Sequence, residues 1–246
     1  YFHSYFIIKE IRKMNYLDLQ KALLNEGINV SDNQLALFQQ YSSLLISWNE
    51  KFNLTAITDE QQIIEKHFLD SLFLAKYINL DNKKVLDIGT GAGFPGIPLA
   101  IIFPNASFYL SDSNGKKITF LKEVVKELNL NNVTIIQSRI EEMNKYRDQF
   151  DYVSARALKQ LNILIELAIP LCKINGSLIA YKGPNYVDEI NLSKNALKQL
   201  DAVIDNSYLY SLPESQDKRS IIVVKKIKAT KHRYPRNYSL IATKPR

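Results

Sequence analysis

The sequence predicts an α/β protein built on a doubly wound, mostly parallel seven-stranded sheet that ends in an antiparallel hairpin and follows an N-terminal helical extension. The main observation is that, from residue 84 onward, short apolar runs alternate with helix-length segments, as in β-α-β units. These runs are "KVLDIG", "SFYLSD", "VTIIQS", "DYVSARA", "SLIAYKG", "SYLYSL" and "SIIVVKKI". The last two are separated only by "PESQDKR", which suits a hairpin and is too short for a crossover helix.

Composition indicates a globular protein with one sizeable core, because 46% of its 246 residues are hydrophobic. The single cysteine, Cys172 in "IPLCKI", excludes a disulfide framework and a cysteine-based zinc site, so we expect a reducing compartment, the cytoplasm. No apolar run reaches the roughly 20 residues that a bilayer span needs, so no membrane partner is expected. We also expect a monomer and no metal site.

Three segments follow one another along the chain. Residues 1–13 precede the first methionine and are interpreted as an upstream or added segment outside the fold. Residues 14–80 form the helical extension, in which Ser31 and Gln34 have the spacing of a capping box. Residues 81–246 carry the sheet and a basic C-terminal tail.

A glycine-rich stretch, "VLDIGTGAGFPGIP", follows the first predicted strand and precedes a helix, which predicts a ligand at the carboxyl end of that strand. Pyrophosphate is poorly served there, because Pro95 offers no N–H where the helix begins. Asp87 would repel a pyrophosphate but could engage the cationic end of S-adenosylmethionine, directly or through water. Asp112, at the end of the second strand, can accept hydrogen bonds from ribose hydroxyls of either cofactor.

Three function classes therefore remain open: a methyltransferase, a nicotinamide-dinucleotide oxidoreductase, and a non-catalytic RNA-binding module on the same fold. Pro95 and Asp87 count against the oxidoreductase. One helix face carries His67, Asp70 and Ser71, and we interpret this group as structural or as part of a lid, since a lone histidine lacks a second metal ligand.

Several motifs occur in the order seen in one family. They are "WNEKFNLTAI", "HFLDSL", "LDIGTGAGFPGIPLAI", "DSNGKKITFL", "SRIEE", "ARAL" and "RYPR". On these motifs the chain resembles the small-subunit ribosomal RNA methyltransferase G family, also called the glucose-inhibited division protein B family. The resemblance implies a Rossmann-like class I methyltransferase fold and S-adenosylmethionine as cofactor. It implies a 16S rRNA (guanine-N7)-methyltransferase that acts in the 530 loop, with 16S ribosomal RNA or a small-subunit precursor as partner.

Site residues follow partly from this resemblance and partly from the residues themselves. The resemblance implies that Gly89, Phe94, Ile140, Glu141 and Arg156 belong to the cofactor site. The physical argument adds Asp87, Gly91 and Asp112. Arg156 and Lys182, which follow the fourth and fifth predicted strands, are expected to face the target nucleotide.

The C-terminal tail has ten Lys or Arg and no Asp or Glu from Lys218 onward, which predicts a surface that faces a polyanion. The residues assigned to RNA binding are Lys225, Lys226, Lys228, Lys231, Arg233 and Arg236. After "RYPR" the chain departs from the family pattern, with Ser239 and Ile241 where a glycine and a proline are usual.

The absence of other motifs indicates which atom is methylated. Methylation at a pyrimidine C5 needs a cysteine nucleophile, and Cys172 lies away from the expected strand ends. The fourth strand is followed by "SARALKQL" instead of the Asn/Asp-Pro-Pro-aromatic motif common in amine methyltransferases. Guanine N7 already presents a lone pair, so positioning alone could suffice and no catalytic side chain is assigned.

Overall fold

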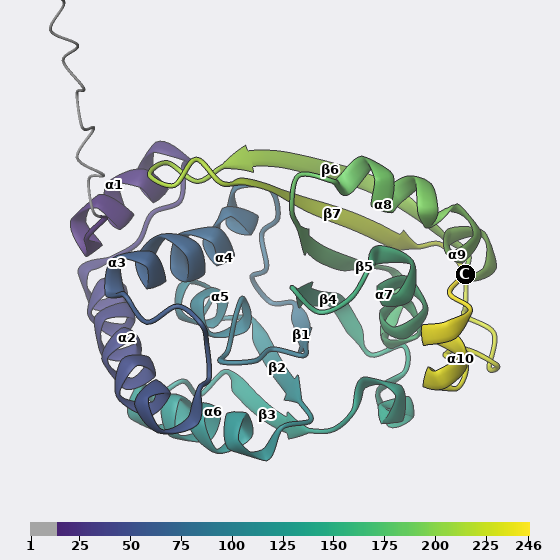
Figure 1. Ribbon diagram of the computed structural model, residues 1–246, viewed down its shortest axis with the longest axis horizontal. Helices are drawn as coiled ribbons and strands as arrows, with labels where there is room; N and C mark the ends of the chain where they lie inside the picture. Colours follow the sequence, from purple (N-terminus) through teal and green to yellow (C-terminus); the bar gives the residue numbers. More distant parts are fainter. Residues whose placement is uncertain (1–13) are drawn as a thin grey trace, which may run out of the picture.

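Seven strands form one sheet in the order β3-β2-β1-β4-β5-β7-β6. Their bounds are β1 Lys84–Ile88, β2 Ser107–Asp112, β3 Val133–Gln137, β4 Phe150–Arg156, β5 Cys172–Lys182, β6 Ala202–Ser211 and β7 Lys218–Lys226. The first five strands pair in parallel, whereas β7 is antiparallel to both β5 and β6. The predicted parallel sheet with a terminal hairpin is therefore confirmed (Figure 1).

The computed structural model describes residues 14–246, so the interpretation of residues 1–13 lies outside the described part of the chain. Ten α-helical segments surround the sheet there. They are α1 Tyr16–Asn25, α2 Asp32–Phe52, α3 Glu60–Ile63, α4 Asp70–Leu72, α5 Gly96–Ile102, α6 Gly115–Glu127, α7 Leu161–Ala168, α8 Tyr186–Leu192, α9 Lys194–Gln199 and α10 Tyr238–Thr243.

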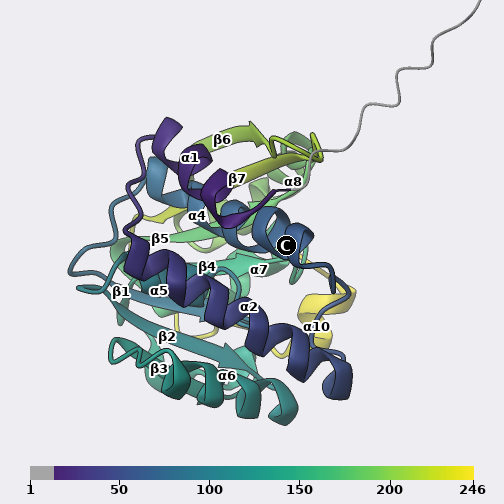
Figure 2. The same cartoon turned by 90° about the vertical axis from the view of Figure 1, so that its left-hand side faces the viewer.

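The helices form two layers, one on each face of the sheet. Buried side chains of α1 to α6 share one apolar cluster with one face, and those of α7 and α9 share a second cluster with the other. Figure 2 shows α1 and α2 crossing in front of the first of these faces. Period-2 alternation divides the central strands between the clusters, since Val85 and Phe108 belong to the first and Leu86 and Val153 to the second.

The N-terminal extension packs on the sheet instead of forming a separate core. The Ser31–Gln34 capping box is present as predicted and starts α2. Tyr41 on α2 is fully buried, and its hydroxyl donates to the carbonyl of Ala92 in the glycine loop. The extension therefore helps to hold the loop that follows β1.

The third predicted helix has an irregular course. It runs from α3 through a π-helical turn, Ile64–Leu69, into α4 and ends in a 3₁₀ turn, Phe73–Lys76. Single π turns inside helices are rare and occur often at functional sites. His67 and Asp70, at this turn, both face the carboxyl ends of the strands.

Candidate functional site

Two adjoining cavities open at the carboxyl ends of the parallel strands, where β1 and β4 lie side by side and the strand order reverses. The first, the glycine-loop cavity, has a volume of about 530 Å³ and is lined by residues that include Gly89, Asp112, Ile140, Glu141, Leu167 and Tyr238. The second, the Arg156 cavity, has about 600 Å³ and includes Lys66, His67, Arg156, Tyr181, Lys182 and Arg219.

The loop after β4 forms the wall between the two cavities. Ala157, Leu158 and Lys159 line both of them. Leu158 lies against Gly89, because a Cβ built on that glycine would come within 2.6 Å of the Leu158 Cδ1 atom. Gly89 also has a φ of +61°, so its lack of a side chain serves both the turn and this close approach.

Asp87 organises the glycine loop from beneath and is fully buried. One carboxylate oxygen accepts hydrogen bonds from the Thr90 hydroxyl (2.6 Å) and the Gly96 N–H (3.1 Å), and the other accepts from the Ser154 hydroxyl (2.8 Å). Burial raises the pKa of Asp87 to about 6, although these hydrogen bonds act in the opposite direction. Asp87 therefore holds the loop and the start of α5, and its contact with a cofactor, directly or through water, stays a prediction.

Asp112 stands at the wall of the glycine-loop cavity, where it was predicted. Its two carboxylate oxygens accept from the backbone N–H groups of Gly91 (3.0 Å) and Asn114 (2.9 Å), and the Lys117 Nζ lies 3.8 Å away. Each oxygen has a second lone pair, so a fixed acceptor remains for a ligand hydroxyl.

The structure brings Gly89, Asp112, Ile140 and Glu141 together around the glycine-loop cavity. The other residues predicted to bind the cofactor do not line this cavity. Gly91 orients Asp112 through its N–H. Phe94 is 5% exposed and stacks on the His67 ring at 4.3 Å, so it supports the neighbouring Arg156 cavity from below. Phe94 is not among the described residues that line the glycine-loop cavity.

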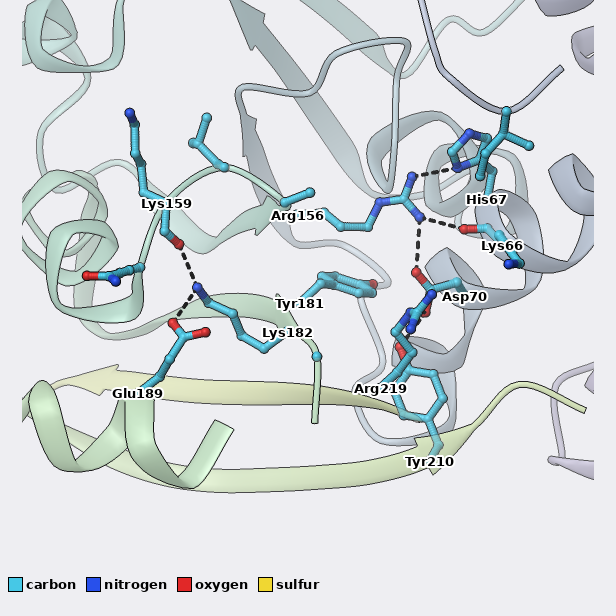
Figure 3. A pocket seen from close by; sticks show the side chains of 15 residues that line it. Lys66, His67, Asp70, Arg156, Lys159, Tyr181, Lys182, Glu189, Tyr210 and Arg219 are labelled. Atoms are coloured by element: carbon cyan, nitrogen blue, oxygen red, sulfur yellow. Dashed lines mark hydrogen bonds and ion pairs between the residues drawn. The ribbon is translucent and has the colours of Figure 1, made fainter. Parts of the chain in front are cut away.

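Arg156 lines the second cavity, as expected for a residue that faces the target, and not the glycine-loop cavity. Its guanidinium donates to the Asp70 carboxylate (3.1 Å), the Lys66 carbonyl (3.1 Å) and His67 Nδ1 (3.0 Å) (Figure 3). It also lies 5.1 Å from the centre of the Phe94 ring.

His67 is a neutral acceptor in this network. Burial, and then the nearby Arg156 cation, lower the pKa of His67 to about 3. Because arginine only donates, His67 Nδ1 accepts from it, and the proton lies on Nε2, which is 3.0 Å from the Thr55 hydroxyl. This geometry supports the structural interpretation of the His67 face and leaves no free base there.

The opposite wall of the Arg156 cavity has its own ion pair (Figure 3). Lys182 Nζ lies 2.6 Å from the Glu189 carboxylate and 2.5 Å from the Lys159 carbonyl. Glu189 also accepts from the backbone N–H of Leu161 at 2.8 Å. Lys182 is therefore at the cavity as predicted, and it ties the shared loop to α8.

Two of the six residues predicted to bind RNA point inward. Lys226 is fully buried, and its Nζ contacts Asp148 (2.5 Å) and the Cys172 carbonyl (2.9 Å), so the prediction for Lys226 is wrong. Arg236 is corrected too, because its guanidinium is occupied by the buried Glu166 of α7.

The remaining four are available to solvent to different degrees. The exposed members are Lys228, Lys231 and Arg233, in the segment after β7, whereas Lys225 is half-buried on that strand.

Cys172 lies at the start of β5, at the end of the sheet opposite to both cavities. It is fully buried, and burial raises its pKa to about 12. The predicted role as a small apolar core residue agrees with this placement.

Sequence reasoning missed several residues of the cavities. Lys66, Tyr210 and Arg219 come from the extension and the hairpin, and Tyr210 donates to Asp70 at 2.8 Å while the Arg219 Nε lies 3.8 Å from that carboxylate. Their convergence depends on tertiary contacts. Lys159 could have been predicted from its place directly after the "ARAL" motif, whereas no motif of the sequence pointed to Tyr238.

The sheet order and the loop after β1 define a class I S-adenosylmethionine-dependent methyltransferase fold. Two solved structures share it. TYW2 from M. jannaschii in complex with AdoMet has a TM-score of 0.56 at 19% identity, over 70% of this chain and 80% of that one. A SAM dependent methyltransferase from Aquifex aeolicus has a TM-score of 0.53 at 17% identity, over 70% of this chain and 96% of that one.

Sequence comparison defines the family. The family model described as rRNA small subunit methyltransferase G matches residues 34–221. Ribosomal RNA small subunit methyltransferase G of Carboxydothermus hydrogenoformans is 41% identical over 89% of this chain and 94% of its own length. The protein of the same name from Thermoanaerobacter pseudethanolicus is 44% identical over 85% of this chain and 88% of its own length. The chain belongs to the rRNA small subunit methyltransferase G family, as the motifs predicted.

Residues 14–246 contain neither a group of metal ligands nor a helix that could span a membrane. There, no group of three or more His, Cys, Asp or Glu side chains is placed to hold a metal ion. Within the same range, each helix is too short or too polar to cross a bilayer.

Proposed function

We propose that the protein is an S-adenosylmethionine-dependent methyltransferase that methylates N7 of a guanine in the 530 loop of 16S ribosomal RNA, in the cytoplasm. The observation that carries this proposal is the pair of adjoining cavities with one shared wall. One has carboxylates and apolar side chains that suit an adenosyl group, and the other is rich in cations that suit a nucleotide.

The residues of the glycine-loop cavity fit S-adenosylmethionine. Asp112 would accept from the ribose, and Ile140 with Glu141 would hold the adenine end. The volume lies in the range of small-ligand sites. A pyrophosphate is poorly served, because the first N–H of α5, that of Gly96, already donates to Asp87. When bound, the cofactor supplies an electrophilic methyl group on sulfur.

The Arg156 cavity has the chemistry of a positioning site. Its arginine and lysine side chains are held by internal partners and so present fixed positive edges to a nucleotide. Burial raises the pKa of Tyr181 and of Tyr210, which keeps both phenols protonated as donors. Among the described side chains that line this cavity, Asp70 and Glu189 are in ion pairs and His67 accepts from Arg156.

A cavity without a free base favours an acceptor atom that needs no deprotonation. Guanine N7 carries its own lone pair, so its methylation would need no side chain of the protein to remove a proton. The protein then needs only to align the two reactants. A cysteine nucleophile is not available here, because Cys172 is buried at the far end of the sheet.

The exposed cations of the C-terminal segment, Lys228, Lys231 and Arg233, would contact RNA phosphates, and Lys225 would add to them from β7. Such contacts release counterions, so the affinity would fall with salt. This surface is separate from the two cavities.

Transfer of labelled methyl to ribosomal RNA from cells that lack the protein tests the proposal, with naked 16S RNA and with small subunits as parallel substrates. We expect label in 16S RNA and a new chain cleavage after borohydride reduction and aniline, which cut RNA at 7-methylguanine. Label without cleavage would contradict N7. RNA binding without transfer would indicate a binding module, and affinity for a nicotinamide dinucleotide alone would indicate an oxidoreductase.

A further inference from the structure

The last ten residues, from Asn237 to Arg246, have a fold of their own that the charge of the tail does not predict. They fold into the short helix α10, whose N-terminal N–H of Ser239 is capped by the Asn237 side chain at 3.0 Å. Ile241 is fully buried, so the helix is seated on the protein body. Figure 1 shows α10 beside α7.

A buried ion pair fixes where α10 sits. Glu166 on α7 is fully buried and accepts from the Arg236 backbone N–H (3.0 Å), Nε (2.7 Å) and a terminal nitrogen (2.6 Å). The same terminal nitrogen donates to the Lys244 carbonyl at 3.1 Å. The Arg236 guanidinium therefore joins α7 to the chain on both sides of α10, at Arg236 itself and at Lys244.

The first residue of this helix reaches the glycine-loop cavity. Tyr238 is half-buried and lines it together with Leu167 of α7 and Ile140 of the turn after β3. Lys159 Nζ lies 5.4 Å from the centre of the Tyr238 ring. These neighbours place the ring at the side of the cavity that the adenine of a cofactor would occupy.

The chemistry of this wall suits a planar base. Adenine has two apolar faces, and side chains that are aromatic or aliphatic pack against such faces better than water does. We propose that Tyr238 is a cofactor-binding residue and that α10 closes the adenine end of the glycine-loop cavity, so that this part of the tail serves the cofactor and not RNA. The inference rests on the proposed use of S-adenosylmethionine.

Calorimetric titration of the full chain with S-adenosylhomocysteine and with methylthioadenosine, which lacks the amino-acid end, tests the inference. Tyr238→Ala should weaken the binding of both ligands by about tenfold, because the stacking contact with the base is lost. Tyr238→Phe should bind as the wild type does. The matched control is Leu240→Ala, because Leu240 is in the same helix, is 42% exposed and is not among the described residues of the cavity.

Hydrogen exchange on the wild-type protein gives a second readout that needs no variant. The amides of α10 should exchange more slowly when S-adenosylhomocysteine is bound. Unchanged exchange in α10, or equal affinity of Tyr238→Ala and the wild type, would overturn the inference and leave the proposed function intact. Failure of the wild type to bind either ligand would instead contradict the proposed function.

Discussion

Replacing Arg236 with methionine should destabilise the protein strongly, although the residue lies in a basic tail. The guanidinium is the counter-charge of Glu166, which is fully buried. Methionine fills similar space but leaves the carboxylate with only one of its three hydrogen bonds from Arg236, the one from the backbone N–H.

The size of the stability loss at pH 7 follows from two contributions. Removing one partner of a buried ion pair costs about 3–5 kcal/mol. The guanidinium also gives the carboxylate two hydrogen bonds, and a hydrogen bond to a charged group contributes about 1.5–3 kcal/mol. We therefore expect the free energy of unfolding to fall by about 3–4 kcal/mol.

Urea unfolding at pH 7, followed by circular dichroism, measures this loss of stability. The matched control is Lys231→Met, an exposed cation of the same segment, which should change stability by less than about 0.5 kcal/mol. The double variant Glu166→Gln/Arg236→Met should lose less stability than Arg236→Met, because it leaves no unpaired charge buried. A loss below about 1 kcal/mol for Arg236→Met, or an equal loss in both variants, would refute the reasoning.

Three further predictions concern the glycine loop, the basic tail and Cys172. Gly93→Ala should cost roughly 3 kcal/mol in urea unfolding, because φ is +104° and the new Cβ would lie 2.6 Å from a tyrosine hydroxyl; Gly183→Ala, with open space around it, should be neutral, and equal costs would contradict the strain. Replacing Lys228, Lys231 and Arg233 together by Gln should make the negative slope of log RNA affinity against log salt shallower by about 2. An unchanged slope would exclude this segment from the interface. Lys226→Gln should instead reduce stability and leave that slope unchanged. Cys172→Ala should keep methyl-transfer activity, and loss of activity in a folded variant would contradict a positioning mechanism.

The fold could be predicted from the sequence because each strand carries its own signal. Apolar runs, their spacing and the Ser31–Gln34 cap are local features, and the structure has them where they were expected. The π turn at Ile64–Leu69 could not be predicted in this way. Its hydrogen bonds are poorer than those of an α-helix, and its contacts with Arg156 come from a strand about 90 residues away in sequence.

The site was predictable in place but not in detail. A motif after β1 fixes which strand end carries a ligand, and Gly89 and Asp112 lie there. Sequence position does not say which way a side chain faces. Asp87 and Asp112 both end strands, yet the first turns under α5 with all its oxygens engaged while the second remains at the cavity wall.

Lys226 shows where a rule already in use would have corrected a prediction. In β7 the residues Ile222 and Val224 belong to one apolar cluster, and strand alternation places position 226 on that same face. Counting charges treats every lysine of the tail as exposed, whereas the period of 2 predicts that this one is buried. A buried ammonium needs acceptors, and Asp148 and the Cys172 carbonyl supply them. The periodicity of a strand should therefore be applied to its charged residues before these residues are assigned to a binding surface.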